Sequence, residues 1–130
     1  MKHIEDAHQA QLVSWAKLRR LPGSIAQGKK VGDFLIAIPN GGKRDIREAA
    51  RLKQQGVKSG VSDLFLALPR GNYCGLWIEM KRPIVKGKSR PKVSEMQNIW
   101  ISKMVVVGYR AKVCYGFDEA RELIEMYLKS

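Results

Sequence analysis

The chain has 130 residues, of which 45% are hydrophobic, so it is long enough to form one domain, residues 1–130, around an apolar core. It has no apolar run that could cross a bilayer and no basic–apolar–small leader, so we expect an intracellular, cytoplasmic protein. Lys and Arg number 24 against 12 Asp and Glu, a net charge of +12, which favours a polyanionic partner over a merely soluble basic surface.

The basic residues are concentrated in three segments. These are "GKK" (28–30), "GGKR" (41–44) and "KRPIVKGKSRPK" (81–92). Because the segments contain Gly or Pro and lack an apolar helical face, they do not favour an amphipathic helix on a membrane surface. A nucleic-acid backbone is the polyanion that fits them best.

The first part of the chain predicts a helix and a short strand. Three-to-four spacing predicts a helix over 4–20, with one stripe formed by Glu5, Gln9, Leu12 and Ala16. The segment "LPGSIAQGKK" (21–30) is a loop. The segment "DFLIAI" (33–38) predicts a strand that ends at the turn "PNGG" (39–42).

A second helix is expected to begin after Asp45 and to stop at Gly56. Asp45 is the expected cap, with Glu48 three places later as in a capping box. Three arginines share one face of this helix, either as a solvated stripe or as a stripe that faces phosphate; they are Arg44, Arg47 and Arg51.

The second half predicts a hairpin, a helix, a strand and a final helix. The runs 64–68 and 74–80 are strands joined by "PRGN" (69–72), which is short enough for an antiparallel hairpin. Ser94 caps a helix that ends at Gly108, residues 109–115 alternate as a strand, and Asp118 caps the last helix. The helix after Ser94 has a stripe formed by Met96, Ile99, Trp100, Lys103, Met104 and Val107, and the last helix has one formed by Ala120, Leu123, Ile124, Tyr127 and Leu128. Cys74 and Cys114 lie in strand-like runs and are expected to be buried thiols.

Two acids stand where buried strands should tolerate none. Asp63 opens the run "LFLAL", and Glu79 closes the run "LWI" with Lys81 two places further on. An antiparallel hairpin brings both acids to one end, and two-residue alternation puts Lys81 on the face of Glu79. A divalent cation would compensate the cost of placing acids there. The plainer alternative is an ordinary ion pair between Glu79 and Lys81 at a strand exit.

These residues resemble the PD-(D/E)xK nuclease superfamily. The chain further resembles small stand-alone VRR-NUC domain nucleases, many of them phage-encoded. The segments that carry this resemblance are "IPNGGKR" (38–44), "EAARLKQQGVKSGVSDLFL" (48–66), "WIEMKRP" (77–83) and "SEMQ" (94–97). The resemblance implies a restriction-endonuclease-like α/β core, in which helices flank a mixed central sheet in the order α-β-α-β-β-α-β-α. One departure is Ser62, where the family often has proline before the aspartate.

The resemblance also implies roles for single residues. Asp63, Glu79 and the backbone carbonyl of Met80 would hold Mg²⁺ or Mn²⁺, and Lys81 would be the catalytic lysine. Glu5 and Gln97 complete the implied catalytic set. The residues expected to contact nucleic acid are Asn40, Lys43, Arg44, Arg47, Lys86, Lys88, Arg90 and Lys92.

Several of these assignments have alternatives. Glu5 could simply be a first-turn acid that complements the helix dipole, and Asp6 is its rival for the catalytic role. Gln97 sits at the third helical position after Ser94, so it is either a capping-box residue or part of the site. His3 and His8 are expected to be surface or packing residues.

The sequence therefore predicts a metal-dependent DNA endonuclease with no small-molecule cofactor and no membrane partner. The resemblance implies branched DNA such as four-way junctions as substrate and a homodimer, for which Trp15, Trp100 and Ile101 offer apolar surface unless they belong to the core. The alternative from another class is a non-catalytic, basic nucleic-acid-binding module on the same fold. A sequence-specific restriction-type enzyme is a third reading, and 130 residues leave it little room for base-reading insertions.

Overall fold

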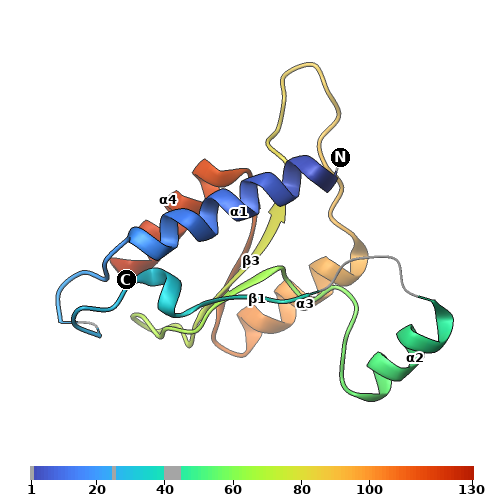
Figure 1. The fold of residues 1–130 in the computed structure, drawn as a ribbon, viewed down its shortest axis with the longest axis horizontal. Coiled ribbons are helices and arrows are strands. Elements are labelled where there is room, and N and C mark those ends of the chain that lie inside the picture. Colours follow the sequence, from blue (N-terminus) through green and yellow to red (C-terminus); the bar gives the residue numbers. More distant parts are fainter. Residues whose placement is uncertain (1, 25, 40–44) are drawn as a thin grey trace.

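The computed structural model describes residues 2–24, 26–39 and 45–130. Helices cover both faces of a sheet that has four strands within these ranges (Figure 1). The elements follow the predicted order: α1 (Lys2–Leu18), a 3-10 turn η1 (Val31–Asp33), β1 (Leu35–Ala37), α2 (Ile46–Gln54), β2 (Leu64–Leu66), β3 (Leu76–Lys81), α3 (Glu95–Val106), β4 (Arg110–Tyr115) and α4 (Phe117–Leu128). The α/β fold class predicted from the sequence is confirmed.

The sheet is mixed, as expected. Its order is β1-β2-β3-β4, with antiparallel pairs β1–β2 and β2–β3 and a parallel pair β3–β4. Parallel neighbours need a crossover connection, and α3 provides it. The predicted hairpin is confirmed: Arg70 and Tyr73 exchange backbone hydrogen bonds of 3.1 and 2.9 Å, and Gly71 between them has a φ of 55°.

The two faces of the sheet are packed differently. One face carries the aliphatic core beneath α1 and α4, where Leu12, Leu64 and Ile78 are fully buried in one cluster. The other face lies under α3 and is aromatic: Phe65 stacks on Trp77 with ring centroids 4.3 Å apart, and Trp100 of α3 meets Trp77 edge-on at 5.2 Å. Side-chain alternation along β3 separates the two layers, because Ile78 faces the first and Trp77 the second.

The first predicted strand is shorter than the sequence indicated. Residues 31–33 form the 3-10 turn η1, in which the Asp33 Oδ2 atom accepts a 2.8 Å hydrogen bond from the backbone N–H of Lys30. An aspartate that bonds the backbone three residues earlier favours a turn over an extended strand. β1 therefore begins only at Leu35.

The prediction that Asp118 caps the last helix is wrong. Gly116, with a φ of 95°, is the N-cap residue, and Asp118 is an exposed residue of the first turn. The backbone N–H of Phe117 instead donates a 2.9 Å hydrogen bond to His8 Nδ1 on α1. His8 therefore joins α1 to the start of α4, two helices that are far apart in sequence.

The cysteine prediction is half correct. Both thiols are free, Cys114 is buried, and Cys74 is exposed. Burial raises the pKa of the Cys114 thiol to about 12, so this cysteine is chemically inert at neutral pH. Cys74 lies between the hairpin turn and the start of β3, before the chain enters the sheet.

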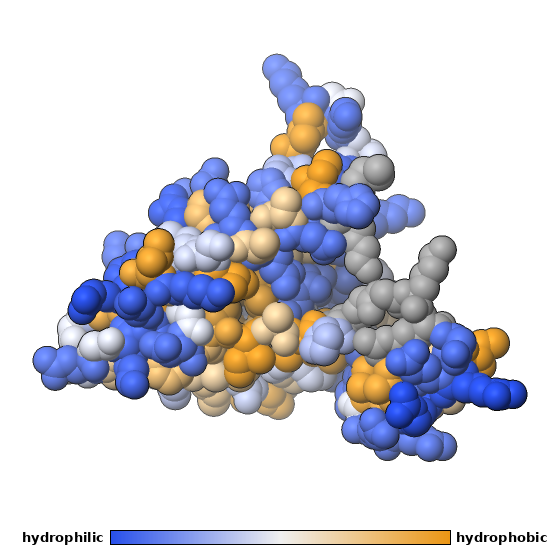
Figure 2. Space-filling model, viewed as in Figure 1, coloured by the Kyte–Doolittle hydropathy of each residue, from blue (hydrophilic) through white to orange (hydrophobic). Residues whose placement is uncertain are grey.

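Helix α2 stands away from the sheet (Figure 1). Its predicted start is confirmed, since Asp45 Oδ1 accepts a 2.8 Å hydrogen bond from the Glu48 N–H, and Gly56 follows its end with a φ of 100°. None of its side chains is buried, and Arg47 and Arg51 are both exposed. In the space-filling view hydrophilic side chains dominate this lobe (Figure 2). Across the described part of the chain, no helix is both long and apolar enough to cross a membrane.

Candidate active site

The hairpin brings Asp63 and Glu79 to the same end of the sheet. Leu64 lies opposite Ile78, so Asp63 and Glu79 are the next residues of the two strands. Asp63 Oδ2 accepts a 2.7 Å hydrogen bond from the backbone N–H of Met80. This bond ties the aspartate to the strand that carries the glutamate, and it fixes the acids beside each other as the sequence predicted.

Glu79 is a buried carboxylate with incomplete compensation. Only 2% of the residue is exposed. Its Oε2 atom accepts a 3.0 Å hydrogen bond from Gln97 Nε2, whereas Oε1 has no hydrogen-bond partner among the described residues. Burial is the largest cause of a rise in the pKa of Glu79 to about 9; the charges of Asp63 and Glu5 act in the same direction, and Lys81 opposes them.

Lys81 lies on the face of Glu79 without neutralising it. Its Nζ atom is 3.9 Å from Glu79 Oε2, a separation too long for a hydrogen bond. The lysine is itself buried, at 9% exposure, and its backbone carbonyl accepts a 2.9 Å hydrogen bond from the Gly116 N–H. An ordinary ion pair between Glu79 and Lys81 therefore does not account for this site, because it leaves Glu79 Oε1 without a hydrogen bond and the ammonium group of Lys81 without one to Glu79.

Gln97 fills both roles that the sequence left open. Its Oε1 atom accepts a 2.9 Å hydrogen bond from the Ser94 N–H, and its own N–H donates to Ser94 Oγ at 3.1 Å, which completes a capping box. The other end of the same amide, Nε2, reaches Glu79. An amide has both acceptor and donor atoms, so the two functions do not compete.

The structure separates Glu5 from its rival Asp6. Glu5 is half-buried on α1 and near enough to act on the charge of Glu79. Asp6 is exposed and lines a shallow hollow on α1 with Gln9 and Lys17. His8, one turn beyond Glu5, accepts a hydrogen bond from the Phe117 N–H, so this part of α1 is held against the start of α4.

The residues at this end of the sheet fit a divalent cation. Among the described residues no group of three or more His, Cys, Asp and Glu side chains could hold a metal ion. An ion would therefore be held by two carboxylates, Asp63 and Glu79, together with the Met80 carbonyl and water, an oxygen set typical of Mg²⁺. The unpartnered Glu79 Oε1 and the repulsion between the acids are the two features that a cation would relieve.

The basic residues lie around this end on exposed segments. Arg47 is on α2, and the loop between β3 and α3 carries Lys86, Lys88, Arg90 and Lys92, all exposed. Arg90 lies over the ring of Tyr115, 4.9 Å from its centroid. Asn40, Lys43 and Arg44 fall outside the described residues.

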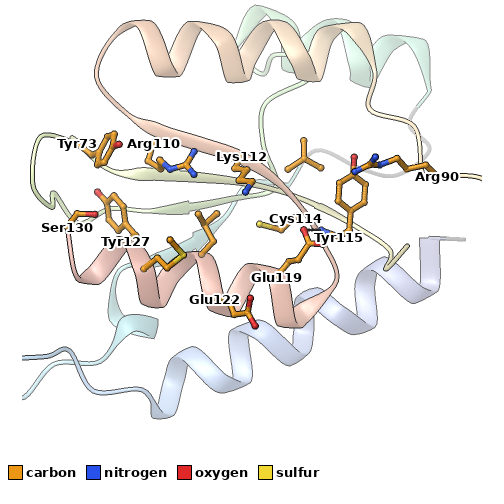
Figure 3. A pocket seen from close by; sticks show the side chains of 13 residues that line it. Tyr73, Arg90, Arg110, Lys112, Cys114, Tyr115, Glu119, Glu122, Tyr127 and Ser130 are labelled. Atoms are coloured by element: carbon orange, nitrogen blue, oxygen red, sulfur yellow. Dashed lines mark hydrogen bonds between the residues drawn. The ribbon is translucent and has the colours of Figure 1, made fainter. Parts of the chain in front are cut away.

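A separate hollow of about 580 Å³ runs along β4 and α4 (Figure 3). Its lining includes Arg110 and Lys112 but also Glu119 and Glu122, and none of the residues of the acidic site. The mixed charge makes it a poor groove for a polyanion. The acidic site, at the end of the sheet away from the hairpin turn, is therefore the better candidate for phosphate chemistry.

Two contacts at this end were missed by the sequence reasoning. His8 was expected only at the surface or in packing, and Tyr115 was not singled out. No local sequence pattern predicts these contacts, because the partners are far apart in the chain: 109 positions for His8 and Phe117, and 25 for Arg90 and Tyr115. By contrast, Ser62 is fully buried just before β2, and its hydroxyl has no hydrogen-bond partner among the described residues, so it makes no hydrogen bond to the acids.

Comparison with known proteins places this arrangement in a class. A four-stranded mixed sheet flanked by helices, with Asp63, Glu79 and Lys81 at one end, is a nuclease-type fold. The family model described as "VRR-NUC domain" matches residues 4–118, and the chain belongs to this family. A solved structure titled "VRR_NUC domain protein" is similar at 32% identity with a TM-score of 0.77, over 96% of this chain and 88% of that one. No curated protein matches.

The raised pKa of Glu79 predicts a pH-dependent stability in the absence of metal. The folded protein keeps the Glu79 proton up to about pH 9, whereas a free glutamate releases it near 4.5. Between these values the folded state binds more protons than the unfolded state, so the free energy of unfolding should fall as pH rises, by at most about 1.4 kcal/mol per pH unit. Glu79→Gln should remove this slope in denaturant titrations with chelator present.

Glu122→Gln is the matched control, because Glu122 is an exposed glutamate. It should keep the wild-type slope. Added Mn²⁺ should stabilise the wild type more at the alkaline end, where it no longer competes with a proton. Equal slopes in the wild type and in Glu79→Gln would contradict the environment assigned to Glu79.

Proposed function

We propose that this protein is a Mg²⁺- or Mn²⁺-dependent endonuclease that hydrolyses phosphodiester bonds in DNA, with branched DNA such as four-way junctions as its preferred substrate. The observation that carries the proposal is Glu79: a buried carboxylate with an unpartnered oxygen, beside Asp63 and Lys81, in a chain of the VRR-NUC family. A structure without phosphate chemistry would gain stability by replacing that carboxylate with an apolar residue.

The chain's own groups divide the chemical work. The bound cation supplies a Lewis acid that offsets phosphate charge and makes water a better nucleophile. Asp63 and Glu79 would hold it, and Gln97, whose Nε2 donates to Glu79, would keep that carboxylate oriented. Lys81, whose ammonium is not hydrogen-bonded to Glu79, is positioned to stabilise the negative charge that builds on the phosphate oxygens.

The exposed cations supply affinity without base recognition. Arg47 and the lysines of the loop after β3 would contact phosphates, and contacts of this kind position DNA without reading its sequence. A non-catalytic binding module would use the same cations. It would have no need of the acids, so substitution of Asp63, Glu79 and Lys81 separates the two readings.

Substitution at the three central positions should abolish cleavage without unfolding the protein. We expect Asp63→Asn, Glu79→Gln and Lys81→Met each to reduce the rate of DNA cleavage by at least about 100-fold, because each removes a group that acts on the transition state. The first two should also weaken Mn²⁺ binding measured by calorimetry, and Lys81→Met should not. Full activity in Glu79→Gln would refute the assignment of the site.

The double role of Gln97 can be tested by changing its amide nitrogen while keeping its amide oxygen. Gln97→Glu keeps an oxygen for the Ser94 N–H but replaces the donor to Glu79 with a negative charge. It should lower the cleavage rate by about tenfold or more while leaving thermal stability nearly unchanged. Ser94→Ala should do the reverse, costing about 1 kcal/mol of stability with little loss of rate. Equal rates for wild type and Gln97→Glu would reduce Gln97 to a cap.

We further propose that the protein works as a homodimer through the outer face of α3. Two of the three apolar residues considered from the sequence do not serve this purpose, since Trp15 packs against the core and Trp100 against Trp77. The third, Ile101, is partly buried. α3 has no buried side chain, and it exposes Met96, Ile99, Val105 and Val106, with Val107 at its end. Exposed apolar side chains gathered on one surface in this way are typical of a contact with another protein chain.

Light scattering should find a dimer, and Val106→Asp should convert it to a monomer, because Val106 is 83% exposed and the new charge would be buried only in the dimer. Leu18→Asp, at a similarly exposed site on α1, should leave the dimer intact. The dimer should place paired nicks symmetrically across a four-way junction, since a two-fold axis presents two identical sites. A wild-type monomer that cuts linear duplex as readily as a junction would eliminate this part of the proposal.

A further inference from the structure

The loop between β3 and α3, residues 82–94, projects from the molecule and is held in shape by hydrogen bonds within it. It leaves the sheet directly after Lys81 and extends from the body of the molecule (Figure 1). The Lys88 N–H donates to the Val85 carbonyl at 3.1 Å, and Gly87 in this turn has a φ of 82°. Arg82 Nη2 donates to the Ser89 carbonyl at 3.1 Å and so joins the outgoing and returning limbs.

The same loop exposes apolar side chains among its cations. Ile84 and Val85 are each 46% exposed. Residues 82–94 contain no acid, and five cations flank the apolar pair: Arg82, Lys86, Lys88, Arg90 and Lys92. The space-filling view shows apolar surface on the projection with hydrophilic side chains beyond it (Figure 2). Cations explain an affinity for phosphate, but they leave the exposed isoleucine and valine unexplained.

Both limbs of the loop are anchored beside the catalytic residues. The outgoing limb continues from Lys81, and the returning limb carries Arg90 onto the ring of Tyr115 (Figure 3). Tyr115 is the residue paired with Lys81 in the register of β3 and β4. The position of Ile84 and Val85 is therefore fixed relative to the site where a phosphate would be cut.

We propose that Ile84 and Val85 form a wedge that enters the base stack where it is already interrupted, at the branch point of the DNA. This inference rests on the proposed nuclease function and deepens it by naming the residues that select branched over linear DNA. Apolar side chains that enter between base steps must unstack them, and this cost is smaller where a junction has broken the stacking. The surrounding cations hold phosphates of any DNA, so they add affinity without selecting shape.

The test measures binding in chelator, so that no cleavage occurs. Four-way junctions and linear duplexes of the same sequence carry 2-aminopurine, a base whose fluorescence rises when it unstacks, next to the branch point. The wedge variant is Ile84→Ser/Val85→Ser, and Val85→Thr is the milder variant, since it keeps the shape of the side chain. Leu18→Ser is the matched control, because it removes an exposed apolar side chain at the C-terminal end of α1, outside the loop of residues 82–94.

A charge variant, Lys86→Gln/Lys88→Gln, separates shape selection from affinity. It should weaken binding to both DNAs alike and reduce the dependence of log affinity on log salt by roughly 0.9 for each phosphate that is no longer neutralised. Wild-type protein and Leu18→Ser should raise the 2-aminopurine signal of the junction. The wedge variant should bind linear duplex as the wild type does, lose about tenfold in preference for the junction, and give no rise in fluorescence.

The proposal is overturned if the wedge variant keeps both the fluorescence rise and the junction preference, or if the wild type binds the junction with no rise. Loss of dimerisation in the wedge variant, seen by light scattering, would also overturn it in favour of contact with a second copy. Failure of the wild type to cleave any DNA with Mg²⁺ or Mn²⁺ would remove the proposed function, while the binding measurement would still decide whether the wedge exists.

Discussion

The carboxylate of Glu79 imposes the constraint on which the site depends, because it is an acid inside a sheet. An ionised group in this position loses its hydration, and protein groups must replace what water supplied. Gln97 replaces part of that hydration by donating a hydrogen bond to Glu79 Oε2. The Lys81 ammonium is too far from the same oxygen to form another. The Asp63 carboxylate makes ionisation of Glu79 still less favourable, since two negative charges at one strand end repel each other. A proton or a cation must resolve this, and the choice between them is set by pH and metal concentration.

The rest of the fold keeps that unfavourable arrangement in place. The bond from the Met80 N–H to Asp63 prevents the two acids from separating. Beneath them the aliphatic core of α1 and α4 fixes β3 from one face, and the aromatic layer of Phe65, Trp77 and Trp100 fixes it from the other. Packing that extends far beyond the site therefore holds the two acids together against their mutual repulsion, as is usual where an unfavourable local geometry is maintained for function.

The features that the sequence predicted well are those set by neighbouring residues. Asp45 and Ser94 were identified as caps because each bonds a group three residues away, and the hairpin placed Asp63 beside Glu79 because its turn is short. Asp118 was misassigned because the N-cap of its helix is Gly116, and the first N–H of the helix, that of Phe117, donates to His8, 109 positions earlier in the chain. Likewise, spacing alone could not tell that Trp100 faces Trp77 while Ile99, its neighbour in sequence, faces outward. The roles proposed for Glu5 and Gln97 come from the family resemblance, and the positions of their side chains required the fold.

The division between the sheet and its projecting segments suggests where substrate choice originates. In the proposed function, two acids and one lysine at a strand end would act on a single phosphate, and a phosphate is the same in every DNA. Discrimination by shape must therefore come from groups that reach further. The loop of residues 82–94, helix α2 and the exposed face of α3 each present charge or apolar surface to solvent. Of these, the loop is joined directly to Lys81, so under the proposed function any force that a branch point exerted on Ile84 and Val85 would act on the strand that carries Glu79 and Lys81.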